Sequence, residues 1–279
     1  MSRANEGLSE TSSSALGQTA PLAESLGALL PADLNAREVG LPALVSAAVL
    51  LAWEFLVPAL GIEAYLLPTP SVIASAFLAK YPTILGALRV TLFEFFLGFS
   101  ATVVAGYLLA LSLAYSKTLE VTFYPYVVLV RSIPIVTLLP MFIIWFGFGF
   151  NSIVVISFLI SFFPMVVNTL SGFKSTDDEL VEMLRSFSAN RREIYRNVLF
   201  YSSLPSVFAA LKICTILAFT GAIVGEFLIG KAGIGALILS YNSSFETPAM
   251  FAGILTVSVS ELLIFGAVTR LESLVVDWQ

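Results

Sequence analysis

The chain has 279 residues, of which 58% are apolar and only 12% are charged, and its formal net charge at pH 7 is −5. Soluble domains carry about 25% charged residues, so this composition indicates an integral membrane protein. The acidic balance argues against nucleic acid as a partner. The sequence contains no histidine, which excludes a histidine-based catalytic triad, metal site or proton relay. Its single cysteine, Cys214, rules out a disulfide within the chain and lies in an apolar run typical of a packing residue.

Residues 1–40 are rich in Ser, Ala, Gly and acidic residues. They lack the basic start and apolar core of a secretory signal. We expect this segment to be a mostly disordered cytoplasmic tail.

Six apolar runs follow, and each approaches the roughly 20 residues that a helix needs to cross a bilayer core about 30 Å thick. They cover residues 41–60, 91–114, 124–146, 153–170, 206–228 and 249–268. An even number of spans puts both termini on one side. Three basic residues (Lys80, Arg89 and Lys231) fall near one face and ten near the other, so the sequence predicts a multi-pass protein of a bacterial-type cytoplasmic membrane with both termini cytoplasmic. The predicted domains are the tail at 1–40, a membrane domain at 41–270 and a short cytoplasmic tail at 271–279.

The second span has a predicted packing face. Residues 65–81, with a Pro-Thr-Pro turn, are expected to form an outer loop before it. Within the span, small residues recur every four positions at Gly98, Thr102, Gly106, Ala110 and Ala114. Such a flat helix face allows close packing in lipid.

The third span carries Pro125, Pro134 and Pro140, which free backbone carbonyls and bend the helix. Freed carbonyls are tolerated in a membrane where they face protein or water, so we expect this helix, and Pro134 in particular, to line a cavity. Arg131 precedes Pro134 and is either a pathway residue or an anchor at the cytoplasmic end of the span.

Carboxylates also fall in or at the ends of predicted spans, at Glu54, Glu94, Glu226 and Glu261. A buried carboxylate must pair, take up a proton or face water, unless it lies at a span end among headgroups. The excess of acids over the single intramembrane arginine favours a neutral or hydrogen-bonding substrate over nitrate or sulfonate. Glu94 is a candidate pathway residue.

The fifth span ends in GAIVGEFLIGKAGIGALI, in which residues 225–231 spell G-x-x-x-x-G-K. A phosphate-binding loop needs Ser or Thr next and a strand before it, whereas Ala232 follows here, so we reject a nucleotide site. Glu226 in this stretch is either a pathway residue or an interfacial carboxylate that is hydrogen-bonded to Lys231.

Residues 174–205 form a charged stretch between the fourth and fifth spans, and ten of the 33 charged side chains fall between Lys174 and Arg196. Ser175 or Thr176, followed by three acids, predicts a helix start. The apolar stripe of this helix comprises Leu180, Met183, Leu184 and Phe187. After a break at 188–190, we expect a second short helix over roughly 191–199. A solvated linker would not need two amphipathic helices.

These residues resemble the coupling signature of the membrane subunit of binding-protein-dependent ATP-driven importers. The signature runs Glu-Ala-Ala, three residues, Gly, nine residues, then Ile-x-Leu-Pro. Glu182 matches the Glu, the apolar positions are kept in type, and Ser188 and Tyr201 replace the Gly and the Pro. The resemblance extends over about residues 88–241, through RVTLFEFFLGF, RSIPIVTLLPMFIIWFGFG, FFPMVVNTLSGF and LPSVFAALKI. The chain is similar to the branch that imports nitrate, sulfonates, taurine, bicarbonate, pyrimidine precursors or riboflavin, and NTLSGFKSTDDEL and TPAMFAGI look closer to the last two.

The resemblance implies an all-α fold, the six-helix type I importer permease. It implies a second copy of the chain, an extracytoplasmic binding protein and separate ATPase subunits that hold ATP and Mg²⁺, with no cofactor or catalytic residue on this chain. The residues it implies for ATPase docking are Glu182, Met183, Leu184, Phe187, Ser188 and Ala189. It also implies that the helix end at Glu226 lines the translocation route and that the glycine-rich stretch after it forms a short outer helix and gate.

Two other classes of function fit the residues. An ion-gradient-driven secondary transporter would carry its proton on Glu94 or Glu226. A membrane scaffold would recruit a soluble partner through residues 174–196.

Overall fold

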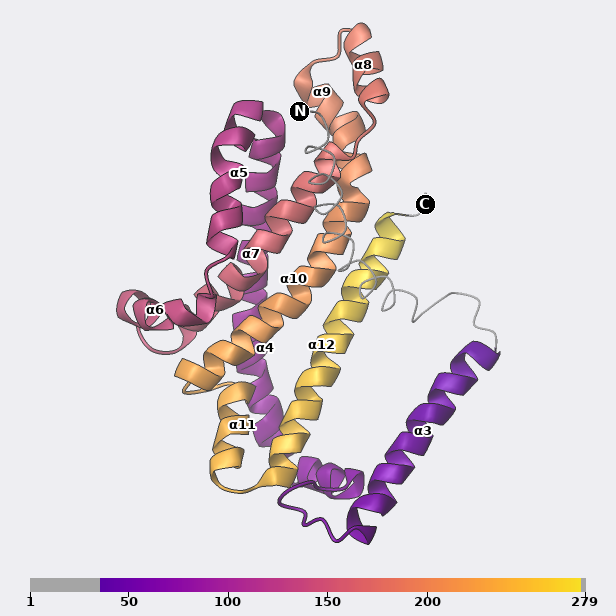
Figure 1. Cartoon of the computed structure of the whole chain (residues 1–279), viewed down its shortest axis with the longest axis vertical. Coiled ribbons are helices and arrows are strands. Elements are labelled where there is room, and N and C mark those ends of the chain that lie inside the picture. Colours follow the sequence, from indigo (N-terminus) through magenta and orange to yellow (C-terminus); the bar gives the residue numbers. More distant parts are fainter. Residues whose placement is uncertain (1–35, 277–279) are drawn as a thin grey trace, which may run out of the picture. The chain divides into compact units, whose positions relative to one another are not determined.

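The computed structural model describes residues 36–276, except for the side chains of residues 36–39, 131, 178 and 191. The predicted tail at 1–40 therefore falls almost wholly outside the described residues. Over the described range the chain is nearly all helical and contains no strand, as the predicted all-α class requires. The elements are α3 (Ala36–Ala59), α4 (Pro70–Tyr115), α5 (Lys117–Arg131), η1 (Ile135–Leu138), α6 (Leu139–Phe146), α7 (Phe150–Lys174), α8 (Asp178–Ser186), α9 (Arg191–Ile194), η2 (Tyr195–Leu199), α10 (Phe200–Ile229), α11 (Ile234–Ser243) and α12 (Thr247–Val275) (Figure 1).

Five of the described helices are long and apolar enough to cross a membrane, and a sixth span results if α5 and the helices after it count together. The axis bends by 82° between these parts. Pro134 is the N-cap of η1 at the bend. Proline has no N–H and disfavours helical dihedrals in the residue before it, so it explains the break. The third predicted span is therefore a bent pair of helices.

The predicted outer loop at 65–81 is wrong from residue 70 onward, because α4 begins at Pro70 and runs for 46 residues. Proline suits the first helical position, whose N–H is unpaired in any helix. The next N–H, from Ser71, donates to Glu54 Oε2 at 3.0 Å, and the Ser71 hydroxyl donates to Glu54 Oε1 at 2.6 Å. Glu54 thus caps α4, which agrees with a glutamate at a span end.

The second helix of the charged stretch is not separate. Residues 192–229 form one candidate span, because α9 and η2 continue directly into α10. The break after α8 is where it was predicted. Of the two short helices predicted in the charged stretch, only α8 is therefore distinct.

The centre of the bundle is α7, which packs against α4 on one side and α10 on the other. Gly98, Thr102, Gly106 and Ala110 of α4 are buried, which confirms the flat face. A methyl group at Gly98 would lie 2.5 Å from Ser157 Oγ of α7. Ser157 Oγ in turn donates to the Ala218 carbonyl of α10 at 2.8 Å. The small side chain of Ser157 therefore sets the spacing of α4, α7 and α10.

We predict that Gly98→Ala lowers the melting temperature and the yield of folded protein. The added methyl group would meet both the Ser157 side chain and the Phe158 backbone nitrogen, at 3.1 Å, so the helices must separate. Gly86→Ala is the matched control in the same helix, since nothing lies within 4 Å of its added methyl group. Alanine favours helix there by about 1 kcal/mol. Equal melting temperatures for the two variants in detergent would contradict this packing.

Candidate functional site

Two buried carboxyl groups meet near the end of α10. Glu94 of α4 is 2% exposed and Glu226 of α10 is 1% exposed. The two carboxyl groups are neighbours, and Glu94 Oε2 is buried without a hydrogen-bond partner among the described residues. The sequence singled out both residues, but it did not predict that they contact each other.

Glu226 also fixes the start of α11. Its Oε2 accepts the N–H of Gly235 at 2.6 Å, and its Oε1 accepts the Thr91 hydroxyl at 2.5 Å. Thr91 Oγ1 accepts the N–H of Ile234 at 2.8 Å. These are the first two N–H groups of α11, which follow its N-cap, Gly233. The Glu226 carboxylate and the Thr91 hydroxyl together cap α11, which starts several residues after Glu226.

Glycine is required at the turn into α11. Gly233 has φ +97°, and a methyl group on it would lie 2.0 Å from Glu226 Oε1. At Gly235 the added methyl group would lie 2.9 Å from Glu226 Cβ. The glycine-rich stretch therefore lets the backbone close onto the carboxylate.

The alternative prediction, a hydrogen bond between Glu226 and Lys231, is wrong. Thr91 and Gly235 hold the carboxylate, and Lys231 is exposed. Gly225 lies inside α10 and Gly230 is its C-cap. The G-x-x-x-x-G-K letters therefore do not form a loop that begins a helix.

The other pathway candidates, Arg131 and Pro134, lie at the bend of the third predicted span. Arg131 is the last residue of α5, and its side chain lies outside the described residues. The carbonyl of Pro134 accepts the N–H of Thr137 at 2.9 Å and its hydroxyl at 2.7 Å. These bonds satisfy a carbonyl at the bend, and a pathway role for Pro134 and Arg131 stays a prediction.

The docking candidates lie on α8 and the turn after it, at the end of α7 and α10 remote from α11 (Figure 1). The N-cap of α8 is Asp177, whose side chain accepts the N–H of Glu179 at 2.9 Å, and not Ser175 or Thr176 as expected. Glu182 is exposed, Met183 is 50% exposed and Phe187 is 76% exposed, while Leu184 and Ala189 are half-buried. Exposed apolar side chains on a charged helix are typical of a contact surface.

Ser188 has φ 61°, in the left-handed region that favours glycine. The coupling signature places glycine at this position. The left-handed backbone at this position explains why the signature has glycine there. In this chain Ser188 adopts the left-handed conformation.

Comparison with known proteins identifies the family to which the chain belongs. The model of the family "Binding-protein-dependent transport system inner membrane component" matches residues 102–276. The chain belongs to this family, and it is a multi-pass inner-membrane transport component. Membership favours the ATP-driven importer over the ion-gradient-driven carrier.

Several relatives match most of the chain. The formylaminopyrimidine transport permease protein ThiX of Halalkalibacterium halodurans is 32% identical over 85% of this chain and 95% of its own. The riboflavin transport system permease protein RibX of Chloroflexus aurantiacus is 33% identical over 82% of this chain and 87% of its own. A solved inward-facing MetNI methionine ABC transporter matches with a TM-score of 0.64 at 20% identity, over 71% of this chain and 98% of that one, which shows the type I permease fold.

Substitution by glutamine separates the roles of the two acids. Two carboxyl groups buried side by side cannot both be ionised without strong repulsion, so one of them holds a proton. Both Glu226 oxygens accept hydrogen bonds, from Thr91 and Gly235, which favours the charged form, whereas Glu94 Oε2 has no partner among the described residues, so Glu94 holds the proton. Glutamine resembles a protonated carboxyl group, because both are neutral and both carry a hydrogen-bond donor and an acceptor. We therefore predict that Glu94→Gln keeps transport and stability near the parent protein, whereas Glu226→Gln lowers both.

Transport rate and melting temperature are measured side by side for the two variants. The loss for Glu226→Gln is expected to be about 1–3 kcal/mol, because an amide N–H would face the donors at the α11 start. The reverse order, with Glu94→Gln the more damaging, would refute this assignment of the proton.

Proposed function

We propose that this chain is the permease subunit of an ATP-driven importer for a small heterocyclic solute, a pyrimidine precursor or a riboflavin-like compound, delivered by an extracytoplasmic binding protein. The observation that carries the proposal is the match to ThiX and RibX over 95% and 87% of their lengths. An aliphatic sulfonate permease of Bacillus subtilis and a taurine permease of Escherichia coli are 27% and 24% identical. Sulfonate, taurine, nitrate and bicarbonate are the alternative substrates. The two buried acids, Glu94 and Glu226, also disfavour an anion.

Energy would come from two ATPase subunits that hold ATP and Mg²⁺. They would dock on α8 and the following turn, with Phe187, Leu184, Met183, Ser188 and Ala189 in a groove and Glu182 at its rim. Support comes from the exposure of Phe187 and Met183 and from the left-handed backbone at Ser188.

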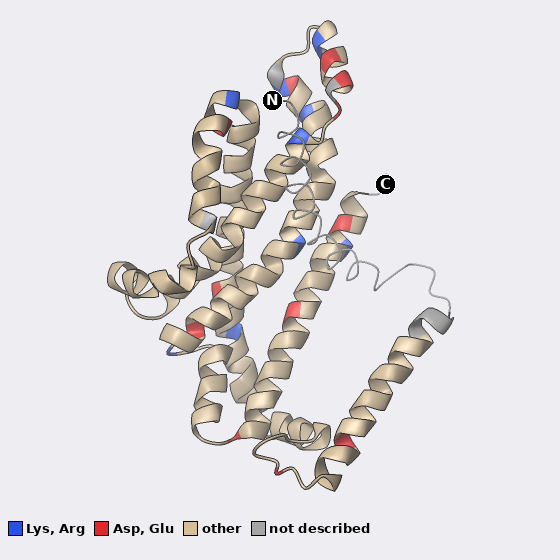
Figure 2. Ribbon diagram, viewed as in Figure 1, with Lys and Arg blue, Asp and Glu red and all other residues tan. Residues whose placement is uncertain are grey.

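The pathway would lie between two copies of this chain. Glu226 and Thr91 hold the start of α11 at the far end of α10, where the gate is expected. Arg131 and Pro134 remain candidates for the pathway wall. Charged side chains gather on α8, α9 and the adjoining η2 (Figure 2). This supports a cytoplasmic position for that end. Six spans would put both termini, with the tails at 1–40 and 271–279, on the same side.

We expect uptake by proteoliposomes that hold this chain, its ATPase partner and its binding protein to require internal ATP. Radiolabelled formylaminopyrimidine, riboflavin, taurine and nitrate are supplied in turn, and initial rates are measured with ATP, with ADP, and with ATP plus an uncoupler. A heterocycle should accumulate only with ATP and in spite of the uncoupler. Accumulation that needs a proton gradient and no ATP would establish a secondary transporter instead.

Docking is tested with a matched pair of exposed phenylalanines. Phe187→Ala should lower recovery of the ATPase with the tagged chain at least about tenfold, since burying such a side chain at an interface stabilises it by about 1.5–3 kcal/mol. Phe245 is 82% exposed and lies between α11 and α12, so Phe245→Ala should leave recovery unchanged. Glu182→Lys is a second disruptive variant on α8. Equal recovery for all three variants would place the contact elsewhere.

A further inference from the structure

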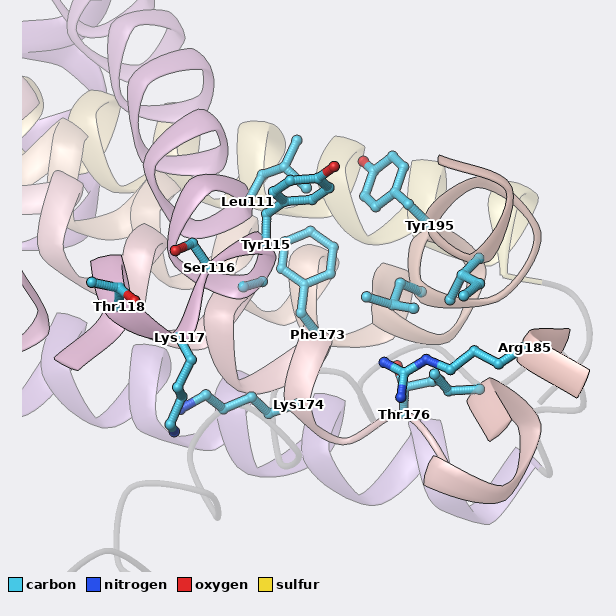
Figure 3. Close-up of a pocket in the computed structure, with 14 residues that line it drawn as sticks. Leu111, Tyr115, Ser116, Lys117, Thr118, Phe173, Lys174, Thr176, Arg185 and Tyr195 are labelled. Atoms are coloured by element: carbon cyan, nitrogen blue, oxygen red, sulfur yellow. The ribbon is translucent and has the colours of Figure 1, made fainter. Parts of the chain in front are cut away.

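A cavity of about 610 Å³ lies where α4, α5, α7, α8 and the α9–η2 segment meet. Its walls come from the turn between α4 and α5, the end of α7, α8, and the α9–η2 segment (Figure 3). The α4–α5 turn and the end of α7 are ends of apolar helices, where a spanning chain reaches the membrane surface. This cavity belongs neither to the carboxyl pair nor to the exposed docking side chains.

The charged side chains that line the cavity are all cationic among the described residues: Lys117, Lys174 and Arg185. The two lysines share one acid outside the lining, Glu120, with Nζ–Oε distances of 2.5 Å for Lys174 and 3.2 Å for Lys117. Arg185 forms no ion pair with any side chain that the structure describes, and it extends across the cavity toward Thr176 (Figure 3). Three cations with one shared acid leave a local excess of positive charge.

Uncharged donors complete the lining. Lys117 and Thr118 are the first residues of α5, so their N–H groups have no partner in the helix and lie at its positive dipole end. The hydroxyl oxygen of Thr176 is buried and has no hydrogen-bond partner in the described part of the chain. Buried polar groups are normally paired, so this hydroxyl indicates a missing acceptor or donor in the cavity.

The remaining lining is apolar and aromatic, with Leu111, Phe173, Tyr195 and Leu199. Tyr195 is held by a 2.5 Å hydrogen bond between its hydroxyl and that of Tyr107. Aromatic rings beside cations at the end of a span are typical of the interface between hydrocarbon and headgroups. Basic pockets between spanning helices bind lipid headgroups.

We infer that this cavity binds a phosphate group, carried by the headgroup of an anionic phospholipid or by a free phosphate. Arg185, Lys117 and Lys174 are the cations that recognise the phosphate, the α5 N-terminus and the Thr176 hydroxyl supply neutral donors, and the aromatic side chains contact the apolar part of a lipid. The bound group ties α8 to the ends of α5 and α7.

The test is a melting titration of the detergent-purified full chain. The probes are dioleoylphosphatidylglycerol, the net-neutral dioleoylphosphatidylcholine, and inorganic phosphate. A saturable rise in melting temperature with phosphatidylglycerol alone identifies a lipid, and the same rise with inorganic phosphate identifies a free ligand. No saturable rise with either anionic probe overturns the inference.

Arg185→Gln should shift the titration midpoint to about fivefold higher concentration, as expected for one cation near a headgroup. Arg192→Gln is the matched control, because Arg192 is exposed on α9 and does not line the cavity. Lys117→Gln repeats the test from another helix should Arg185→Gln fail to fold. Equal midpoints for the lining and control variants would show general attraction to charge and overturn the site.

Discussion

The close contact of α7 with both α4 and α10 is the constraint on which the rest of the structure depends. In lipid, apolar side chains gain little by facing each other, so helices associate through close packing and hydrogen bonds between them. Ser157 provides both, since it faces Gly98 of α4 and donates to the Ala218 carbonyl of α10. A second polar contact joins α4 to α7, between the hydroxyls of Thr102 and Ser161 at 2.7 Å. With α4 and α10 fixed against α7, Glu94 and Glu226 come within reach of each other.

The carboxyl pair shows how a membrane protein uses an acid without exposing it. A buried carboxylate is costly unless hydrogen bonds replace its water. The start of α11 and Thr91 provide these bonds. In return, the carboxylate accepts the N–H of Gly235 and Thr91 accepts that of Ile234, which the helix cannot pair by itself. The acid is thus compatible with its apolar surroundings because a helix begins beside it.

The sequence predicted what depends on local pattern and missed what depends on distant contacts. Apolar runs and the four-residue spacing of small residues were enough for the spans and the flat face of α4. The start of α4 was missed because its cap, Glu54, lies 17 residues before Ser71. Thr91 was missed because it lies 135 positions from Glu226. Its position three residues before Glu94, on the same face of α4, was the one available signal.

The continuity of α9, η2 and α10 gives the proposed importer a mechanical basis. The candidate span at 192–229 is 38 residues long, or about 57 Å at 1.5 Å per residue. One of its ends joins the turn after α8, and the other carries Glu226. A single helical rod that begins beside the proposed ATPase contact and ends at the proposed gate transmits a displacement without a chain of side-chain rearrangements. Because Glu226 bonds to the start of α11, a shift of α10 either carries α11 with it or breaks the cap. Alternating access requires discrete arrangements of this kind, and the structure has the one in which the cap is intact.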